Sequence, residues 1–362
     1  MSAGRPDPAG RPPTLPTRIT HRFELFRGRE WAWLGMGAVA ALAWPLLVTQ
    51  HWLHITNLSL IAVMGAVGLN LLTGNARLVS LGQAAFLAIG GFSAGAMAHH
   101  FAAPFWLSLI VAMLLGGLFG LIVAIPSLRL KALYVAITTL ALHFGVTAAF
   151  AVYLARVIRS EGILIDPPHF GFFELYDAAP WYYFLLVIAA LVVIGALNLQ
   201  RSHLGRRWVA VADHEVASAA LGISIYRAKV SVFVITSMLV SFAGCLGAYY
   251  EGVVTEGFYD LHLAIAYLAM IIVGGLGSVL GSILGAFLIT LMPYGLDFLL
   301  KIGGIKISAG SISGMHSVLY GLLIVGFMLF EPLGLAEIWR RVRDYFTLWP
   351  FKYRPLDQLR QR

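Results

Sequence analysis

The sequence predicts an all-α polytopic membrane protein, and both its composition and its charge placement point to that class. Of the 362 residues, 59% are hydrophobic and 12% are charged, whereas a soluble globular domain has about 25% charged residues. Long apolar runs contain no Asp, Glu, Lys or Arg; these runs are 31–76, 78–128, 178–200, 230–250 and 263–296. Each reaches the roughly 20 residues that a helix needs to cross a bilayer core, and a helix satisfies its own backbone groups in lipid.

We expect about eight to ten transmembrane helices, some of them partial spans or interrupted by glycine. In chain order the expected spans are 31–50, 55–73, 80–99, 105–126, 132–155, 181–199, 229–250, 262–275, 278–294 and 313–331. The pair 262–275 and 278–294 is short, so one or both need not cross fully. Residues 31–335 are therefore predicted to form one transmembrane domain.

Polar segments flank this domain. Residues 1–30 are rich in Pro, Gly and Arg and have no apolar core, which predicts a disordered tail rather than a signal peptide. Residues 336–362 are predicted to form a basic tail. With ten crossings, one side of the membrane carries 21 of the 25 Lys and Arg residues. The positive-inside rule then places both tails in the cytoplasm of a multi-pass protein.

Several other functional classes find no support in the sequence. The basic residues that give the net charge of +8 lie in loops between apolar runs, so a lipid bilayer is the expected partner rather than nucleic acid. A single cysteine, Cys245, excludes an intrachain disulfide and is interpreted as a small buried hydrophobe. The chain has no P-loop and no H-E-x-x-H motif. We therefore expect no catalytic residues, no metal and no cofactor bound by this chain.

A first cluster of polar residues lies at membrane depth around glycine breaks. Within 68–86 these residues are Asn70, Thr73, Ser80 and Gln83. Unwound backbone at such a depth is stable only when it is buried in protein or lines a cavity. The four side chains are therefore candidate substrate-pathway residues. The alternative is that they hold helices together through hydrogen bonds worth about 1 kcal/mol each.

A second glycine break is predicted between the spans 262–275 and 278–294. Its candidate pathway residues are Gly274, Gly275, Gly277 and Ser278, which are typical of a junction between two half-helices. Glycine then recurs at 281 and 285, and this spacing of four favours close approach of another backbone. For these later glycines plain packing is the favoured interpretation.

The loop 201–229 is polar with helical character, and we expect a short helix in it that ends at Gly222. Val209, Val216, Ala219 and Ala220 can share one face of that helix, with Asp213 near its positive start. Such a helix fits a docking element for a partner. The alternative is a helix that lies on lipid head groups.

The pattern Glu215-Val-Ala217-Ser218-Ala-Ala-Leu-Gly222 resembles the coupling loop of ABC importer membrane subunits, in the form found in branched-chain amino acid permeases of the LivM type. The resemblance spans about 55–335. Its other motifs are Asn-Leu-Leu-x-Gly at 70–74, Ser-Leu-Gly-Gln-Ala-Ala-Phe at 80–86, Leu-Arg-Leu-Lys-Ala-Leu-Tyr at 128–134, Ser-x-x-Gly-Arg at 202–206, Val-Gly-Gly-Leu-Gly-Ser at 273–278 and Leu-Phe-Glu-Pro-Leu-Gly-Leu at 329–335.

This resemblance implies a multi-subunit importer of the bacterial inner membrane. A periplasmic binding protein would deliver substrate to a heterodimer of this chain with a LivH-type sister permease. Two cytoplasmic ATPases, which bind the ATP and magnesium, would dock on the coupling loops. The implied docking residues are Arg206, Asp213, Glu215, Ala217, Ser218 and Gly222.

The chain departs from the family pattern at its outer loop and at the first break. Arg77 stands where the family usually has Gly, and Arg159 replaces part of a glycine-containing outer motif. Arg159 is a candidate contact for a carboxylate-bearing substrate, with a plain surface charge as the alternative. Similar permeases serve urea, amides and aromatic acids, so the substrate stays open. A stand-alone secondary transporter is the other alternative.

Overall fold

The computed structural model describes residues 41–127, 132–168, 177–302, 309–331 and 334–348. The chain divides into two compact units, Met1–Thr49 and Gln50–Arg362, and each is considered by itself. In the first unit, residues 41–47 are helical. The predicted tail 1–30 and most of the predicted span 31–50 lie outside the described residues. All that follows concerns the second unit.

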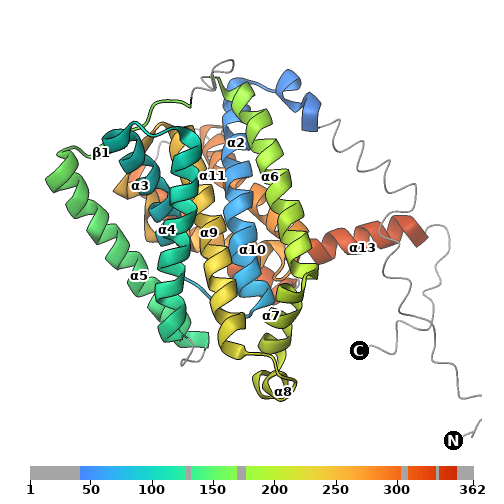
Figure 1. The fold of residues 1–362 in the computed structure, drawn as a ribbon. Helices are drawn as coiled ribbons and strands as arrows, with labels where there is room; N and C mark the ends of the chain where they lie inside the picture. The colour runs from blue at the N-terminus through green and yellow to red at the C-terminus, as the bar shows by residue number, and fades with distance from the viewer. Residues whose placement is uncertain (1–40, 128–131, 169–176, 303–308, 332–333, 349–362) are drawn as a thin grey trace, which may run out of the picture. The chain divides into compact units, whose positions relative to one another are not determined.

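The second unit is built almost entirely from helices (Figure 1). The long apolar helices are α2 (Gln50–Asn70), α3 (Gln83–Phe101), α4 (Phe105–Ser127), α5 (Ala132–Tyr153), α6 (Ala178–Arg201), α9 (Ile225–Glu251), α10 (Leu261–Gly274), α11 (Val279–Ile302) and α12 (Ala309–Phe330). Six described helical segments are long and apolar enough to cross a bilayer, and α11 and α12 contribute shorter apolar stretches. The predicted class of all-α polytopic membrane protein is confirmed.

Helix α2 runs through the centre of this bundle. Fifteen consecutive or near-consecutive positions from Leu53 to Asn70 are buried, and α6, α9, α10 and α11 all pack against it. A helix that is apolar on every side is one surrounded by protein or lipid. In contrast, α4, α5 and α6 expose rows of large apolar side chains such as Leu114, Ile137 and Leu191, so these helices form the outer faces of the bundle.

Small residues let α9 approach its neighbours closely. Gly116 and Gly120 of α4 face Ser241 and Ser237 of α9, and Gly244 of α9 faces the backbone of α3. The Ser241 hydroxyl also donates to the carbonyl oxygen of Phe86 at 2.8 Å. Helices in lipid associate through such close packing and hydrogen bonding because burial of apolar surface gives little gain there.

A short β-sheet interrupts the helical pattern. Strand β1 (Gly162–Leu164) pairs antiparallel with β2 (Val253–Thr255), with Gly162 opposite Thr255. The sheet joins the segment after α5 to the segment after α9. Its central pair, Ile163 and Val254, is buried.

The chain beyond α12 is also helical. Helix α13 (Gly334–Leu348) occupies the first part of the segment predicted as a basic tail, and it packs against α10 and α11 at its start. The remaining tail residues, 349–362, lie outside the described residues.

Candidate functional site

The first predicted break is present at the end of α2. The helix changes there into one turn of π-helix, η2 (Leu71–Asn75), and α3 begins only at Gln83. The polar side chains of this break all bond to the chain itself. Thr73 donates to the carbonyl oxygen of Leu78 at 3.3 Å, Ser80 accepts from the Gly82 N–H at 3.4 Å, and Gln83 donates to the carbonyl oxygen of Gly65 at 2.9 Å.

Asn70 joins this break to the second one, about 200 residues further along the chain. Its amide nitrogen donates to the carbonyl oxygen of Ser278 (2.8 Å) and to the hydroxyl of Ser282 (2.6 Å). Its amide oxygen accepts from the Gly277 N–H at 2.8 Å. Asn70 is 2% exposed. The side chain therefore pairs the Gly277 N–H in the second break and adds a bond to the Ser278 carbonyl.

The second break lies where it was predicted. Helix α10 ends at Gly274, α11 begins at Val279, and both Gly275 (φ +119°) and Gly277 (φ +78°) adopt backbone angles that favour glycine. A Cβ on Gly74 would collide with the backbone of Gly277. The two breaks are thus in direct contact, and glycine on both sides permits it. The pathway role of these residues stays a prediction.

The loop between α6 and α9 holds two short helices instead of one. These are α7 (His203–Asp213) and α8 (Glu215–Ala220), and His214 between them is extended (φ −150°). Val209 therefore lies on a different helix from Val216, and the expected common face does not exist. Asp213 ends α7 and does not begin the coupling helix. The predicted stop is confirmed, because Gly222 follows α8 with φ +79°.

The remaining predicted coupling residues divide into two groups. Ala217 is exposed, while Ser218 is buried and donates to the carbonyl oxygen of Ala210 at 2.8 Å, which fastens α8 to α7. Arg206 lies in the first turn of α7, where its guanidinium bonds to the carbonyl oxygen of Arg201 and to His203. Neither of these two partners of Arg206 belongs to α8.

Two ion pairs connect this loop to the bundle. Arg77 meets Asp213 at 2.7 Å, and Lys229 at the start of α9 meets Glu215 at 2.6 Å. Three of these four residues, Arg77, Glu215 and Lys229, line a cavity of about 260 Å³, whose apolar wall includes Trp208. The Trp208 indole is buried and donates to Ser231 at 2.9 Å. The first break and the coupling loop therefore meet at this cavity.

Arg77 combines an ion pair with an unfavourable backbone conformation. Its φ is +52°, which for a residue with a Cβ costs roughly 1–2 kcal/mol. Its side chain is 66% exposed and that of Asp213 is 49% exposed, so the ion pair contributes only about 0–1 kcal/mol. The pair is weak enough to break and re-form during a conformational change.

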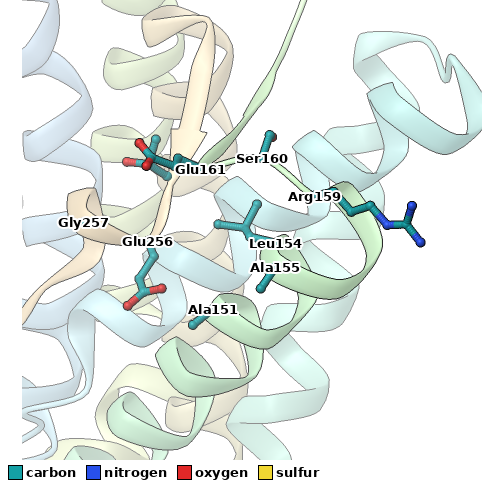
Figure 2. A pocket seen from close by; sticks show the side chains of 9 residues that line it. Ala151, Leu154, Ala155, Arg159, Ser160, Glu161, Glu256 and Gly257 are labelled. Carbon is teal, nitrogen blue, oxygen red and sulfur yellow. The ribbon is translucent and has the colours of Figure 1, made fainter.

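An open pocket of about 730 Å³ lies at the other end of the bundle, between the end of α5 and β2. Its polar residues are Arg159, Ser160, Glu161, Thr255 and Glu256. Figure 2 shows the Arg159 guanidinium pointing away from the other lining side chains. Arg159 has φ +57° and follows one turn of π-helix, η3 (Leu154–Ile158). In this structure Arg159 borders the pocket without filling it.

Sequence reasoning missed three partners of the predicted residues. Lys229 and Ser282 were not selected because a single basic or hydroxyl residue gives no signal until its partner is known. Arg77 was noticed as a departure from a family pattern, but its ion pair with Asp213 depends on the fold. The three residues between Thr73 and Arg77 gave no hint of this contact.

Comparison with known proteins decides the family. Residues 52–329 match the family described as branched-chain amino acid transport system, permease component. The chain belongs to this permease family. It is 30% identical over 330 residues to the high-affinity branched-chain amino acid transport system permease protein LivM of Escherichia coli, covering 83% of this chain and 74% of that relative.

Two other permeases also match. The probable branched-chain amino acid transport permease protein LivM of Methanocaldococcus jannaschii is 26% identical over 238 residues, covering 63% of this chain and 67% of that relative. The probable ABC transporter permease protein y4mJ of Sinorhizobium fredii is 30% identical over 190 residues, covering 50% and 56%. No solved structure matches the chain. Both helix breaks and the coupling loop fall inside the family match.

Proposed function

We propose that this permease is the translocation subunit of an ATP-driven importer for branched-chain or related amino acids in the bacterial inner membrane. The observation that supports it most is helix α8. Its Val216 is 85% exposed, and Leu221 directly after it is 82% exposed. Large apolar side chains this exposed mark an interaction surface, and the loop sequence resembles the ATPase-docking loop of importers.

ATP and magnesium belong to separate cytoplasmic ATPases in this proposal. Such an ATPase would cover Val216 and Leu221, while Glu215 and Asp213 hold α8 and α7 to the bundle. The positive charge concentrated on the same side as this loop supports a cytoplasmic position for it and for both termini.

A short series of contacts connects the coupling loop to both helix breaks. Asp213 is paired with Arg77, which lies in the irregular segment between η2 and α3. Seven residues earlier, Asn70 is bonded to Gly277 and Ser278 in the second break. A shift of the loop would therefore displace residues at both breaks. ATP biases such a change only if the ATPase binds the two conformations with different affinity.

The other surfaces fit the remaining proposed partners. The exposed apolar faces of α4 and α5 suit lipid and a LivH-type sister permease. Strand β1 lies at the end of the bundle opposite α8 (Figure 1). The pocket beside Arg159 includes Thr255 of its partner strand β2, and a periplasmic binding protein would dock there. Substrate choice in this proposal rests mainly on that binding protein.

Two alternatives remain distinguishable. The same machinery could serve urea, amides or aromatic acids, which uptake of labelled substrates would reveal. A stand-alone secondary transporter would need charged residues within the spans for ion coupling, and the long apolar runs contain none. Accumulation of substrate against a gradient by the isolated chain in liposomes, without ATP, would overturn the importer proposal.

The docking surface is tested by placing a charge on it. Val216→Asp is expected to lower the amount of ATPase that co-purifies with the permease by about tenfold or more, since burying a charge at an apolar contact costs over 1 kcal/mol. Leu164→Asp is the matched control, because Leu164 is 81% exposed on β1 at the opposite end. Equal recovery of the ATPase with both variants would count against α8 as the docking element.

A further inference from the structure

Helix α13 carries an apolar stripe that the bundle does not cover. Ile338 is 39%, Trp339 54% and Val342 43% exposed, and at helical spacing these three positions share one face. Tyr345 and Phe346 repeat the same spacing in the sequence. The opposite face is charged, with Glu337, Arg340 and Arg341 as its first members. Among residues 334–342, the part of the helix whose burial is described, Gly334 and Ala336 at its start are buried.

The position of α13 is fixed by its connection to α12. The apolar helix α12 ends at Phe330, and α13 begins four residues later. The two helices are bonded to each other at this point, since the Glu331 N–H donates to the carbonyl oxygen of Phe327 (2.9 Å) and the Gly334 N–H donates to the carbonyl oxygen of Glu331 (2.8 Å). Helix α13 therefore starts at the depth where α12 leaves the apolar layer.

An ion pair keeps the first two turns of α13 at that depth. The Arg341 guanidinium makes two bonds to the Glu331 carboxylate, at 2.7 and 3.1 Å. Glu337 pairs with Arg340 at 2.9 Å on the same charged face. Because Glu331 directly follows α12, helix α13 cannot swing away from the end of the bundle without breaking this two-bond ion pair.

A glycine contact sets the direction of α13. Gly334 has φ +69°, and a Cβ there would collide with Gly275 and with the carbonyl oxygen of Val273. The backbone therefore turns sharply against the α10–α11 break. Figure 1 shows the result: α13 lies across the direction of α2, α6 and α9 instead of continuing along it.

We propose that α13 is an interfacial helix that lies in the surface of the bilayer, with Ile338, Trp339 and Val342 in the lipid and the arginine face toward the head groups and water. An amphipathic helix with Trp on its apolar face and Arg on its polar face is suited to that zone. Its start at the end of an apolar helix, and its course across the bundle, place the stripe at lipid and not in water. The proposal does not depend on which substrate the permease carries.

Site-directed spin labelling tests this placement in the full-length chain, reconstituted in vesicles of phosphatidylethanolamine and phosphatidylglycerol. Single cysteines replace Ile338, Val342 and Arg340 in a Cys245→Ala background, and collision rates are measured with oxygen, which partitions into lipid, and with a water-soluble nickel chelate. We expect the ratio of oxygen to nickel collisions to be severalfold higher at 338 and 342 than at 340. The matched control is Val216→Cys, an exposed apolar position on α8 that is expected to favour nickel.

Two results would overturn the proposal. Nickel access at 338 and 342 equal to that at 340 would mean that the helix is surrounded by water. Low collision rates with both reagents at 338 and 342 would mean that protein covers the stripe instead of lipid. All four positions are exposed, so the substitutions leave the packing of the bundle unchanged.

Discussion

At the scale of single residues, Asn70 connects the two helix breaks. It makes three hydrogen bonds to the second helix break, and its side chain is buried. A buried donor or acceptor left without a partner costs about 1–3 kcal/mol. Removing this one amide would leave the Gly277 N–H without its partner and would take one bond each from the Ser278 carbonyl and the Ser282 hydroxyl. The residue identified as a pathway candidate is, in this conformation, a clamp between two interrupted helices.

Asn70→Ala is expected to lower the free energy of unfolding by about 2–4 kcal/mol, since it removes all three bonds. Thermal unfolding in detergent provides the measurement. Asn75→Ala is the control, because Asn75 is half-buried and its amide oxygen accepts a bond from Gln200 at 3.1 Å. Similar losses for the two variants would show that Asn70 is not a clamp.

Two substitutions of Arg77 distinguish the effect of backbone strain on stability from the effect of the ion pair. Arg77→Gly and Arg77→Ala both remove the pair with Asp213, but only glycine relieves the positive φ of 52°. Arg77→Gly is therefore expected to be more stable than Arg77→Ala by about 1 kcal/mol. ATP-dependent uptake, in contrast, is expected to fall equally in the two variants and in Asp213→Asn. Full uptake in Arg77→Gly would rule out a role of the pair in coupling.

At the scale of elements, the α10–α11 hairpin shows what glycine placement achieves. Gly274 faces Gly281, and Gly285 faces Met270 and Gly274, so the two helix backbones touch without side chains between them. The spacing of these glycines predicted both the break and the close approach. Most helix bounds also fell within a few residues of the prediction, because each apolar run is limited by charged or glycine-containing segments.

A pair of identical substitutions on α11 tests this contact. Gly281→Ala is expected to destabilise the protein by about 1–3 kcal/mol through overpacking. Gly295→Ala on the same helix has open space around it, and it is expected to raise stability by up to about 1 kcal/mol, because alanine favours helix over glycine. Melting temperatures that shift in the same direction would contradict the close approach of α10 and α11.

The short elements were harder to foresee. The split of the coupling loop into α7 and α8 depends on an extended His214, and no helix-breaking residue stands at that position. The β1–β2 pair joins segments about 90 residues apart in the sequence. Each strand has only three residues, which is too few for an alternating pattern to be recognised.

At the scale of the whole molecule, the two ends of the helical bundle differ in chemistry. The end with α7 and α8 carries Arg77, Arg206, Arg227 and Lys229, together with the exposed apolar residues of α8. The other end carries the small sheet and the pocket with Glu161 and Glu256. This polarity follows the positive-inside pattern and fits an importer that meets an ATPase at one end and a binding protein at the other.

The polarity leads to a topology prediction. In spheroplasts, a membrane-impermeant maleimide is expected to label Leu164→Cys. It is expected to leave Leu221→Cys unlabelled until the inner membrane is permeabilised. Both side chains are over 80% exposed, so access to the reagent depends on the side of the membrane alone. Labelling of residue 221 from outside would reverse the proposed orientation and remove the basis for ATPase coupling.

The sequence by itself determined the fold class, most helix bounds, both glycine breaks and the family, because each of these is encoded locally by apolar runs, glycines or short motifs. Only the tertiary structure decided that Asn70 bridges the two breaks, that Arg77 reaches Asp213, and that α13 turns across the bundle. Each of these contacts joins residues that are distant in the chain or depends on a backbone angle. A partner of that kind leaves no periodic mark in a sequence, and its geometry exists only once the helices have packed.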